Sequence, residues 1–304
     1  MTNNKLSPKI YLQQFQELED GVLLLNKDYI KNNFLFPAIF LKEKSHFPYI
    51  YKADNILVCG TRHRSDPMHF QMGYIQKAIE QFKPDIILTE GAIQLRESVR
   101  NIGKKYLKEV IHDRLVQTGD LNSIIKQYHE FGIGYKYSYD NNIPITSWEP
   151  TFLASYKFIL SQGFTIEDFF EYLVYRGILI YARRKIGFEK HIQYLNNYLL
   201  RYWNFKLKYL NFDFSIVNFI RIYNQNNQTS FTESDFVDSP ELFKGSKNYP
   251  KINNLFLFFR DKSLIRISKL KANQYKRVFV IAGVGHILMT EEKLRTLNSK
   301  TLTN

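Results

Sequence analysis

The chain has 304 residues, of which 44% are hydrophobic, so it can bury a sizeable core as one large globular domain or two ordinary ones. It carries 42 Lys and Arg residues against 29 Asp and Glu, and the resulting formal net charge of +13 favours acidic partners such as nucleic acid, anionic lipid or an acidic substrate. The single cysteine, Cys59, excludes an internal disulfide.

Residues 1–50 mix short apolar runs with Asn, Lys and prolines, so we expect an irregular lead-in there. This segment lacks the uninterrupted apolar run of a secretory signal. No segment of the chain reaches the roughly 18 apolar residues that a membrane span requires. We therefore expect a soluble, cytoplasmic protein.

The clearest predicted unit follows this lead-in and has the order strand, helix, strand. The run NILVCG, which begins at Asn55, predicts a buried strand, FQMGYIQKAIEQF predicts a helix, and PDIILTEG predicts a second strand. Both strands are apolar without alternation, which is typical of parallel strands covered by helices on both faces. In the intervening loop, Asp66 is expected to be the N-cap of a helix that begins near Pro67.

Two further strands are predicted, one from Ile143 to Trp148 and one in RVFVIAG, which ends at Gly283. These strands predict an α/β fold with a mostly parallel central sheet flanked by helices, formed by residues 51–150 and 251–304. Residues 151–250 are expected to form a large helical insertion rich in aromatic residues.

Helices are expected between these strands. Residues 94–131 have few helix breakers before Gly132 and Gly134, so we expect a helical segment that stops there. Polar, turn-rich residues from 224 to about 250 predict a loop, and a helix over about 253–272 leads into the last strand.

Each predicted parallel strand ends in a residue suited to chemistry. His63 follows the first strand, Glu90 the second, Glu149 the third and His286 the last, and each histidine comes three residues after a glycine. Ligands of open α/β sheets bind beyond the carboxyl ends of the strands, where glycine lets the backbone approach closely. We expect at least three of these four residues to share one site.

Two kinds of chemistry suit such a site. Histidine and carboxylate are ligands for a divalent ion such as Zn, Mn or Co, and His63, Glu90 and His286 are the predicted metal ligands. Without a metal, a carboxylate could orient a histidine that deprotonates water. The local spacing matches neither H-E-x-x-H nor a cysteine-rich zinc pattern, so both alternatives stay open.

Three residues of the first loop are candidates for substrate binding. Arg62 and Arg64 could hold a carboxylate or phosphate of the substrate. His69 would lie in the first turn of the following helix, near the crevice.

The segments CGTRH, ILTEG and IAGVGH, in this order at strand ends, resemble the TraB/GumN and Tiki family, whose members carry two Gly-x-x-His motifs and a glutamate after the second strand. The segment FFRDKSLIRISKLKANQYKRVFVIAGVGH is similar to that family's closing segment, in which an Arg-Asp or Arg-Asn pair begins a helix. The resemblance covers about residues 54–92 and 255–290, and weakly 143–150. The wider superfamily includes erythromycin-esterase-like and ChaN-like proteins.

The resemblance implies a compact α/β fold with a catalytic site formed by His63, Glu90, Arg260 and His286. Tiki proteins are described as metal-dependent proteases, so the implied reaction is metal-assisted hydrolysis of an amide or ester bond in a small molecule or peptide. Glu149 is added from its place at a strand end. Arg260 either pairs with nearby acids at a helix start or lies buried in the crevice, where it clamps Glu90 or the developing charge of the substrate.

Two other functions remain open. The same scaffold could bind haem or another small ligand, in the manner of ChaN-like proteins. The stretch from Tyr181 to Leu210 interleaves basic and aromatic residues and could bind nucleic acid or an anionic membrane, or simply form the core and solvated face of the insertion.

Overall fold

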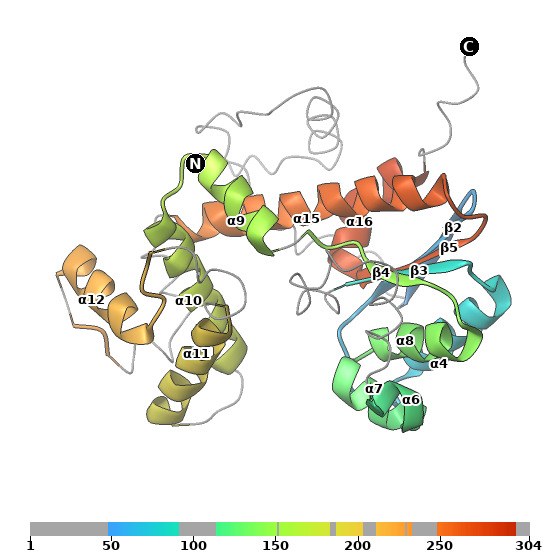
Figure 1. The fold of residues 1–304 in the computed structure, drawn as a ribbon, viewed down its shortest axis with the longest axis horizontal. Helices are drawn as coiled ribbons and strands as arrows, with labels where there is room; N and C mark the ends of the chain where they lie inside the picture. The colour runs from blue at the N-terminus through green and yellow to red at the C-terminus, as the bar shows by residue number, and fades with distance from the viewer. Residues whose placement is uncertain are drawn as a thin grey trace, which may run out of the picture. The chain divides into compact units, whose positions relative to one another are not determined.

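The computed structural model describes residues 48–90, 114–150, 152–182, 187–202, 211–228, 230–232 and 248–295 (Figure 1). The predicted lead-in therefore lies outside the described residues except for its last three positions. Among the helices of the described ranges, none is both long enough and apolar enough to cross a membrane.

A five-stranded sheet with the order β1-β2-β5-β3-β4 forms the centre of the α/β part. The strands are β1 (Tyr49–Ala53), β2 (Ile56–Thr61), β3 (Ile86–Thr89), β4 (Ile145–Ser147) and β5 (Val278–Gly283). β1 pairs antiparallel with β2, and the other neighbours are parallel. The predicted mostly parallel sheet is confirmed, and β1 is an additional edge strand.

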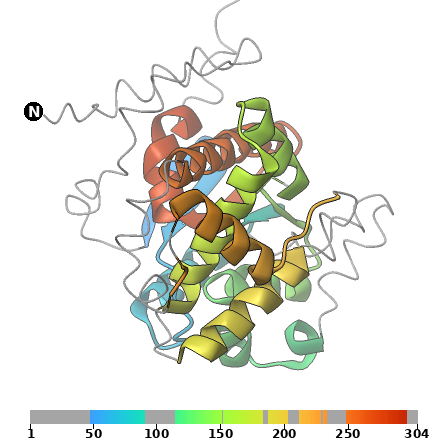
Figure 2. The same ribbon diagram turned by 90° about the vertical axis from the view of Figure 1, so that its left-hand side faces the viewer.

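Helices cover both faces of this sheet (Figures 1 and 2). Helices α4 (Phe70–Phe82), α7 (Leu121–Tyr128) and α8 (Phe131–Asn141) pack on one face, where Cys59 and Ile281 belong to a buried apolar cluster. Helix α16 (Val284–Arg295) packs on the other face against Gly60, where an added methyl group would lie 3.3 Å from Ile287 Cβ. Successive residues of β2 thus alternate between the two helical layers.

The predicted helical segment 94–131 is only partly described. Residues 91–113 lie outside the described ranges, and α6 (Arg114–Thr118) precedes α7 and α8. Gly132 and Gly134 do not end a helix, because both lie inside α8. A methyl group at Gly132 would lie 3.0 Å from the Ile124 carbonyl oxygen, and one at Gly134 3.2 Å from Ile281 Cδ1. These glycines let α8 pack closely against α7 and the sheet.

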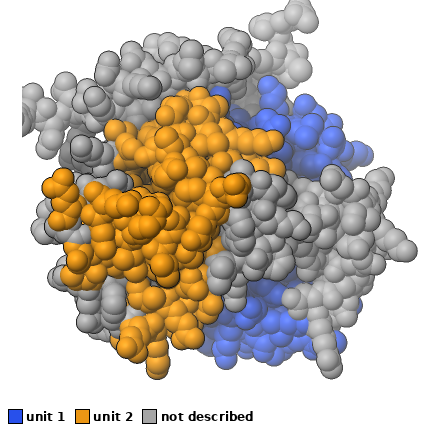
Figure 3. All heavy atoms as spheres, turned by 60° about the vertical axis from the view of Figure 1, so that its left-hand side comes forward, with its two compact units in different colours: residues 1–21, 35–150, 259–304 blue, residues 22–34, 151–258 orange. Residues whose placement is uncertain are grey.

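The chain divides into two compact units (Figure 3). Unit 1 contains the described residues of 35–150 and 259–304, and unit 2 contains those of 151–258. The second boundary falls inside α15 (Tyr249–Ala272), so this helix contributes residues to both units.

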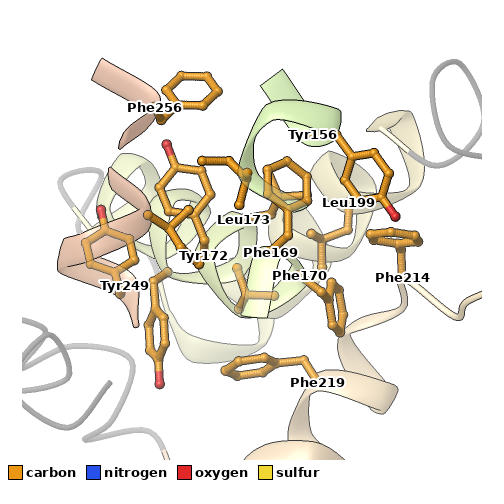
Figure 4. Close-up of a cluster of buried hydrophobic side chains, with 14 of the residues drawn as sticks. Tyr156, Phe169, Phe170, Tyr172, Leu173, Leu199, Phe214, Phe219, Tyr249 and Phe256 are labelled. Carbon is orange, nitrogen blue, oxygen red and sulfur yellow. The ribbon is translucent and has the colours of Figure 1, made fainter. Parts of the chain in front are cut away.

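Unit 2 consists of helices around an aromatic core (Figure 4). They are α9 (Phe152–Ser161), α10 (Ile166–Ala182), α11 (Phe188–Tyr202), α12 (Ile216–Asn227) and the first part of α15. The buried ring of Phe170 makes edge contacts with the ring of Phe214 at a centroid distance of 5.3 Å and with that of Phe219 at 6.3 Å. α12 continues past the predicted start of the loop at residue 224, and residues 233–247 of that loop lie outside the described ranges.

Candidate functional site

The carboxyl end of β5 brings three of the predicted site residues together in unit 1. A methyl group added to Gly283, the last residue of β5, would lie 3.4 Å from Glu90 Oε2, 3.6 Å from His63 Nε2 and 3.8 Å from His286 Cδ2. The Gly283 N–H donates a 2.8 Å hydrogen bond to Glu90 Oε2. Two histidines distant in the sequence thus approach the same glycine, beside a buried carboxylate.

Glu149 and Arg260 complete the buried part of this group. Arg260 Nη2 lies 2.5 Å from Glu90 Oε1 and also forms an ion pair with Glu149 Oε1. All three side chains are buried, and the guanidinium lies over the ring of Trp148 at 5.6 Å from its centroid. Arg260 therefore lies in the crevice and clamps Glu90, and it does so from the middle of α15, not from a helix start.

Trp148 fixes the strand end that carries Glu149. Its indole N–H donates to the Ile281 carbonyl at 3.2 Å, and its own carbonyl accepts a 2.6 Å hydrogen bond from Ser263 Oγ. Its ring also meets the ring of His286 edge-on at a centroid distance of 5.3 Å. One buried tryptophan thus connects β4, β5, α15 and the second histidine.

The electrostatics of Glu90 favour its charged form. Burial alone would raise the pKa of this carboxyl, but the charge of Arg260, followed by those of the two imidazoles, brings the pKa well below its usual range. Glu90 is therefore a carboxylate at neutral pH. Its oxygens accept from Arg260 and Gly283, which makes it a fixed acceptor at the centre of the site.

His63 is the exposed imidazole of the site. Its side chain is 54% exposed, its Nδ1 lies 2.9 Å from Glu130 Oε1, and its Nε2 lies 3.7 Å from Glu90 Oε1. The hydrogen bond with Glu130 raises the pKa of His63 against the opposing effect of burial. Because a carboxylate only accepts, Nδ1 carries the hydrogen, and Nε2 of the neutral ring is left with a free lone pair.

Glu130 is a site residue that the sequence did not suggest. It is fully buried and accepts hydrogen bonds from Thr61 Oγ1 at 2.9 Å and from the Arg64 N–H at 3.1 Å, in addition to His63 Nδ1. It precedes α8, which the two glycines bring close to the sheet. The pattern Glu-Phe-Gly-Ile-Gly is the signal that could have indicated it, because paired glycines at a helix start allow close packing there.

Asp261 pairs with the second histidine in the way that Glu130 pairs with His63. His286 Nδ1 lies 2.5 Å from Asp261 Oδ1, and both side chains are buried. Asp261 belongs to the Arg-Asp pair quoted for the resemblance, but it was not itself nominated as a site residue. The site therefore contains two carboxylate–imidazole pairs, one accessible and one enclosed.

The loop that carries His63 is held mainly by hydrogen bonds to its backbone. Gln71, buried in α4, accepts from the Arg62 N–H at 3.3 Å and donates to the Arg62 carbonyl at 2.6 Å. The side chains of Arg62 and Arg64 are exposed. They border the site and do not belong to its buried group.

The start of α4 differs from the prediction. His69 is the N-cap, with its side chain accepting from the Gln71 N–H at 3.4 Å, and its ring stacks on Phe70. Asp66 instead accepts from the Met68 N–H at 2.9 Å in the preceding turn. The expected Asp66 cap is therefore wrong, and substrate binding by His69 stays a prediction.

The predicted metal ligands His63, Glu90 and His286 all approach Gly283, and metal binding by them stays a prediction. Within the described ranges, no group of three or more His, Cys, Asp or Glu side chains is placed so that it could hold one metal ion. Glu90 already accepts from a guanidinium and a backbone N–H, and the positive charge of Arg260 lies against the same oxygen that faces His63.

No known family model, curated protein or solved structure matches the chain. The likeness to the TraB/GumN and Tiki family therefore rests on the quoted motifs and stays a prediction.

Proposed function

We propose that this protein is a hydrolase of amide or ester bonds that works by general acid–base catalysis at the carboxyl end of β5. The observation that carries the proposal is the pair of imidazoles at Gly283, each with its Nδ1 bound by a buried carboxylate. Such pairing sets the tautomer and orientation that a catalytic base needs.

His63 is the base in this proposal. Its neutral ring accepts a proton from water at Nε2 while the water oxygen attacks the carbonyl carbon of the substrate, and Glu130 stabilises the imidazolium that forms. Its exposure lets water and substrate reach it. The proton then passes to the leaving amine or alcohol as the carbonyl–nitrogen or carbonyl–oxygen bond breaks.

The remaining groups position these reactants. Glu90 stays ionised and accepts from Arg260, so it favours the protonated form of the neighbouring His63. His286, enclosed beside Trp148 and held by Asp261, is the second imidazole available for proton transfer at the leaving group. Arg260 binds two carboxylates and thereby fixes the shape of the site.

Assays of His63→Ala and His286→Ala on a panel of chromogenic esters and amides test the proposal. We expect each variant to lose about 10²-fold or more in kcat/KM, because each removes an imidazole from proton transfer. His129→Asn, which replaces an exposed histidine outside the contacts described above, is the matched control and should retain full activity. Full activity in both site variants would refute the proposal.

Metal assistance, haem binding and a cytoplasmic location stay predictions. Bound metal measured in the purified protein and in His63→Ala tests the first, and a Soret band on titration with haem tests the second. Loss of metal and activity together in His63→Ala would favour a metal-assisted reaction over the one proposed.

The variant Gly283→Ala tests whether activity depends on the space beside Gly283, at little expected cost to stability. The new methyl group would make ordinary contacts of 3.4 to 3.8 Å, so we expect the free energy of unfolding to change by less than about 1 kcal/mol. It would occupy space within 4 Å of both imidazoles, and activity should fall about tenfold or more. Gly73→Ala, where a methyl group meets nothing within 4 Å, is the control. Undiminished activity in Gly283→Ala would mean that this space is not used.

A further inference from the structure

Three large apolar side chains are exposed directly after the loop that carries His63. Met68 is 85% exposed, and Phe70 and Tyr74 are each 59% exposed. The other strongly exposed large hydrophobics in the described ranges, such as Val217 and Leu270, are isolated from one another in the sequence. Scattered apolar residues are normal on a protein surface, whereas a group of them marks an interaction site.

Two of these side chains, Phe70 and Tyr74, contact each other in unit 1, and Met68 precedes them in the sequence. The Phe70 ring stacks on His69 at a centroid distance of 4.5 Å and meets the Tyr74 ring edge-on at 6.5 Å. Tyr74 also lines an apolar hollow of about 470 Å³ between α4 and strands β1 and β2, together with Leu57 and Phe82. The apolar surface thus extends from the loop along the face of α4.

Positive charge borders this surface. Arg62 and Arg64 are exposed at its loop end, and Lys77 lines the hollow. Asp66 is the single acidic residue among positions 62–74, in a chain with a formal net charge of +13. Apolar and aromatic side chains next to arginine and lysine suit the interface of an anionic membrane, where the cations meet lipid phosphates and the apolar groups enter the acyl boundary.

We propose that residues 62–74 form a docking surface for an anionic lipid bilayer. Met68, Phe70 and Tyr74 enter the headgroup region, and Arg62 and Arg64 bind lipid phosphates. The positive charge beside the exposed apolar side chains is what favours an anionic lipid surface. The inference does not depend on hydrolysis, but it would place the exposed His63 at the lipid surface.

Co-sedimentation of the full chain with vesicles tests this docking surface. We expect the protein to pellet with vesicles of equal parts phosphatidylcholine and phosphatidylglycerol, much less with phosphatidylcholine alone, and less as salt is raised. The triple variant Met68→Ser, Phe70→Ser, Tyr74→Ser should bind anionic vesicles about tenfold or more weakly. These side chains are exposed, so the variant should stay folded, which circular dichroism checks.

The double variant Val217→Ser, Leu270→Ser is the matched control, because it removes exposed apolar groups elsewhere, and it should bind like the original protein. Absence of binding to anionic vesicles at low salt would overturn the proposal. So would equal binding to neutral vesicles, or binding unchanged in the triple variant. His286→Ala should still bind vesicles, so a failure of the proposed reaction and a failure of docking give different results.

Discussion

Replacement of Arg260 by methionine is expected to lower the free energy of unfolding by about 3–5 kcal/mol, because it leaves two buried carboxylates without their counter-ion. Glu90 and Glu149 are both buried, and both pair with the same guanidinium nitrogen. Methionine preserves most of the side-chain volume, so the loss measures charge and not a cavity. Denaturant unfolding at neutral pH gives the value. Arg266→Met, at an exposed position of the same helix, should change it by less than about 0.5 kcal/mol.

The loss of stability in Arg260→Met should become smaller as pH falls. In the original protein the pKa of Glu90 is depressed, so the stability it contributes is present above the ordinary carboxyl pKa and is lost as pH falls through the folded-state pKa. Without Arg260, burial and the neighbouring Glu149 oppose ionisation, and protonation relieves the folded state. The difference between the two proteins should therefore shrink between about pH 7 and about pH 4.

Compensating substitutions distinguish this explanation from simple misfolding. The triple variant Arg260→Met, Glu90→Gln, Glu149→Gln removes all three charges and should recover at least about half of the lost stability. Arg260→Lys keeps the charge and should be intermediate, since an ammonium lacks the planar guanidinium that lies over the Trp148 ring. A triple variant as unstable as Arg260→Met, or a loss that does not change with pH, would show that the ion pairs are not the cause.

The part of the site on the sheet could be predicted because strand ends are visible in the sequence. The end of an apolar run indicates where the next polar residues lie, and parallel strands bring those places to one edge. His63, Glu90, Glu149 and His286 were nominated in this way, and the structure places them at that edge. Arg260 came from the resemblance alone, since nothing in its helical surroundings sets it apart.

The partners of the two histidines could not be predicted, because Glu130 precedes a helix and Asp261 lies within one, and an acidic residue in either place usually faces solvent. Glu130 and Asp261 are buried only because α8 and α15 approach the sheet closely, which is a property of tertiary packing. The cap of α4 was wrong for a related reason. Asp66 and His69 can each bind a nearby backbone N–H, and only the path of the loop, held by Gln71, selects His69.

Replacement of Glu130 by glutamine is expected to lower kcat/KM by about 10²–10⁴-fold while the protein stays folded. The reason lies in the three donors around Glu130. The Arg64 N–H can only donate, so it selects the orientation in which the amide oxygen takes the place of Oε2. The amide nitrogen then occupies the place of Oε1 and donates to His63 Nδ1. His63 must accept there, its hydrogen moves to Nε2, and the base loses its free lone pair.

Folding should change little, because each group keeps a partner. Thr61 Oγ1, which now donates to Glu130, can accept from the amide and donate to the Ala282 carbonyl, 3.3 Å away. Thermal or denaturant unfolding of Glu130→Gln should therefore stay within about 1–2 kcal/mol of the original protein. Glu80→Gln, an exposed acid on α4, is the control for both activity and stability.

The pH profile separates catalysis from a merely structural role. Glu130 is the main cause of the raised pKa of His63, so its charge sets the pH at which the base becomes neutral and kcat/KM begins to rise. Removal of that charge should lower the pKa of His63 and move the acid limb of the profile to lower pH, while the plateau falls. A lower plateau with an unmoved acid limb would mean that Glu130 supports the loop but does not act on the base. An unchanged plateau of kcat/KM would mean that His63 is not the base, because a base that has lost its lone pair cannot accept a proton.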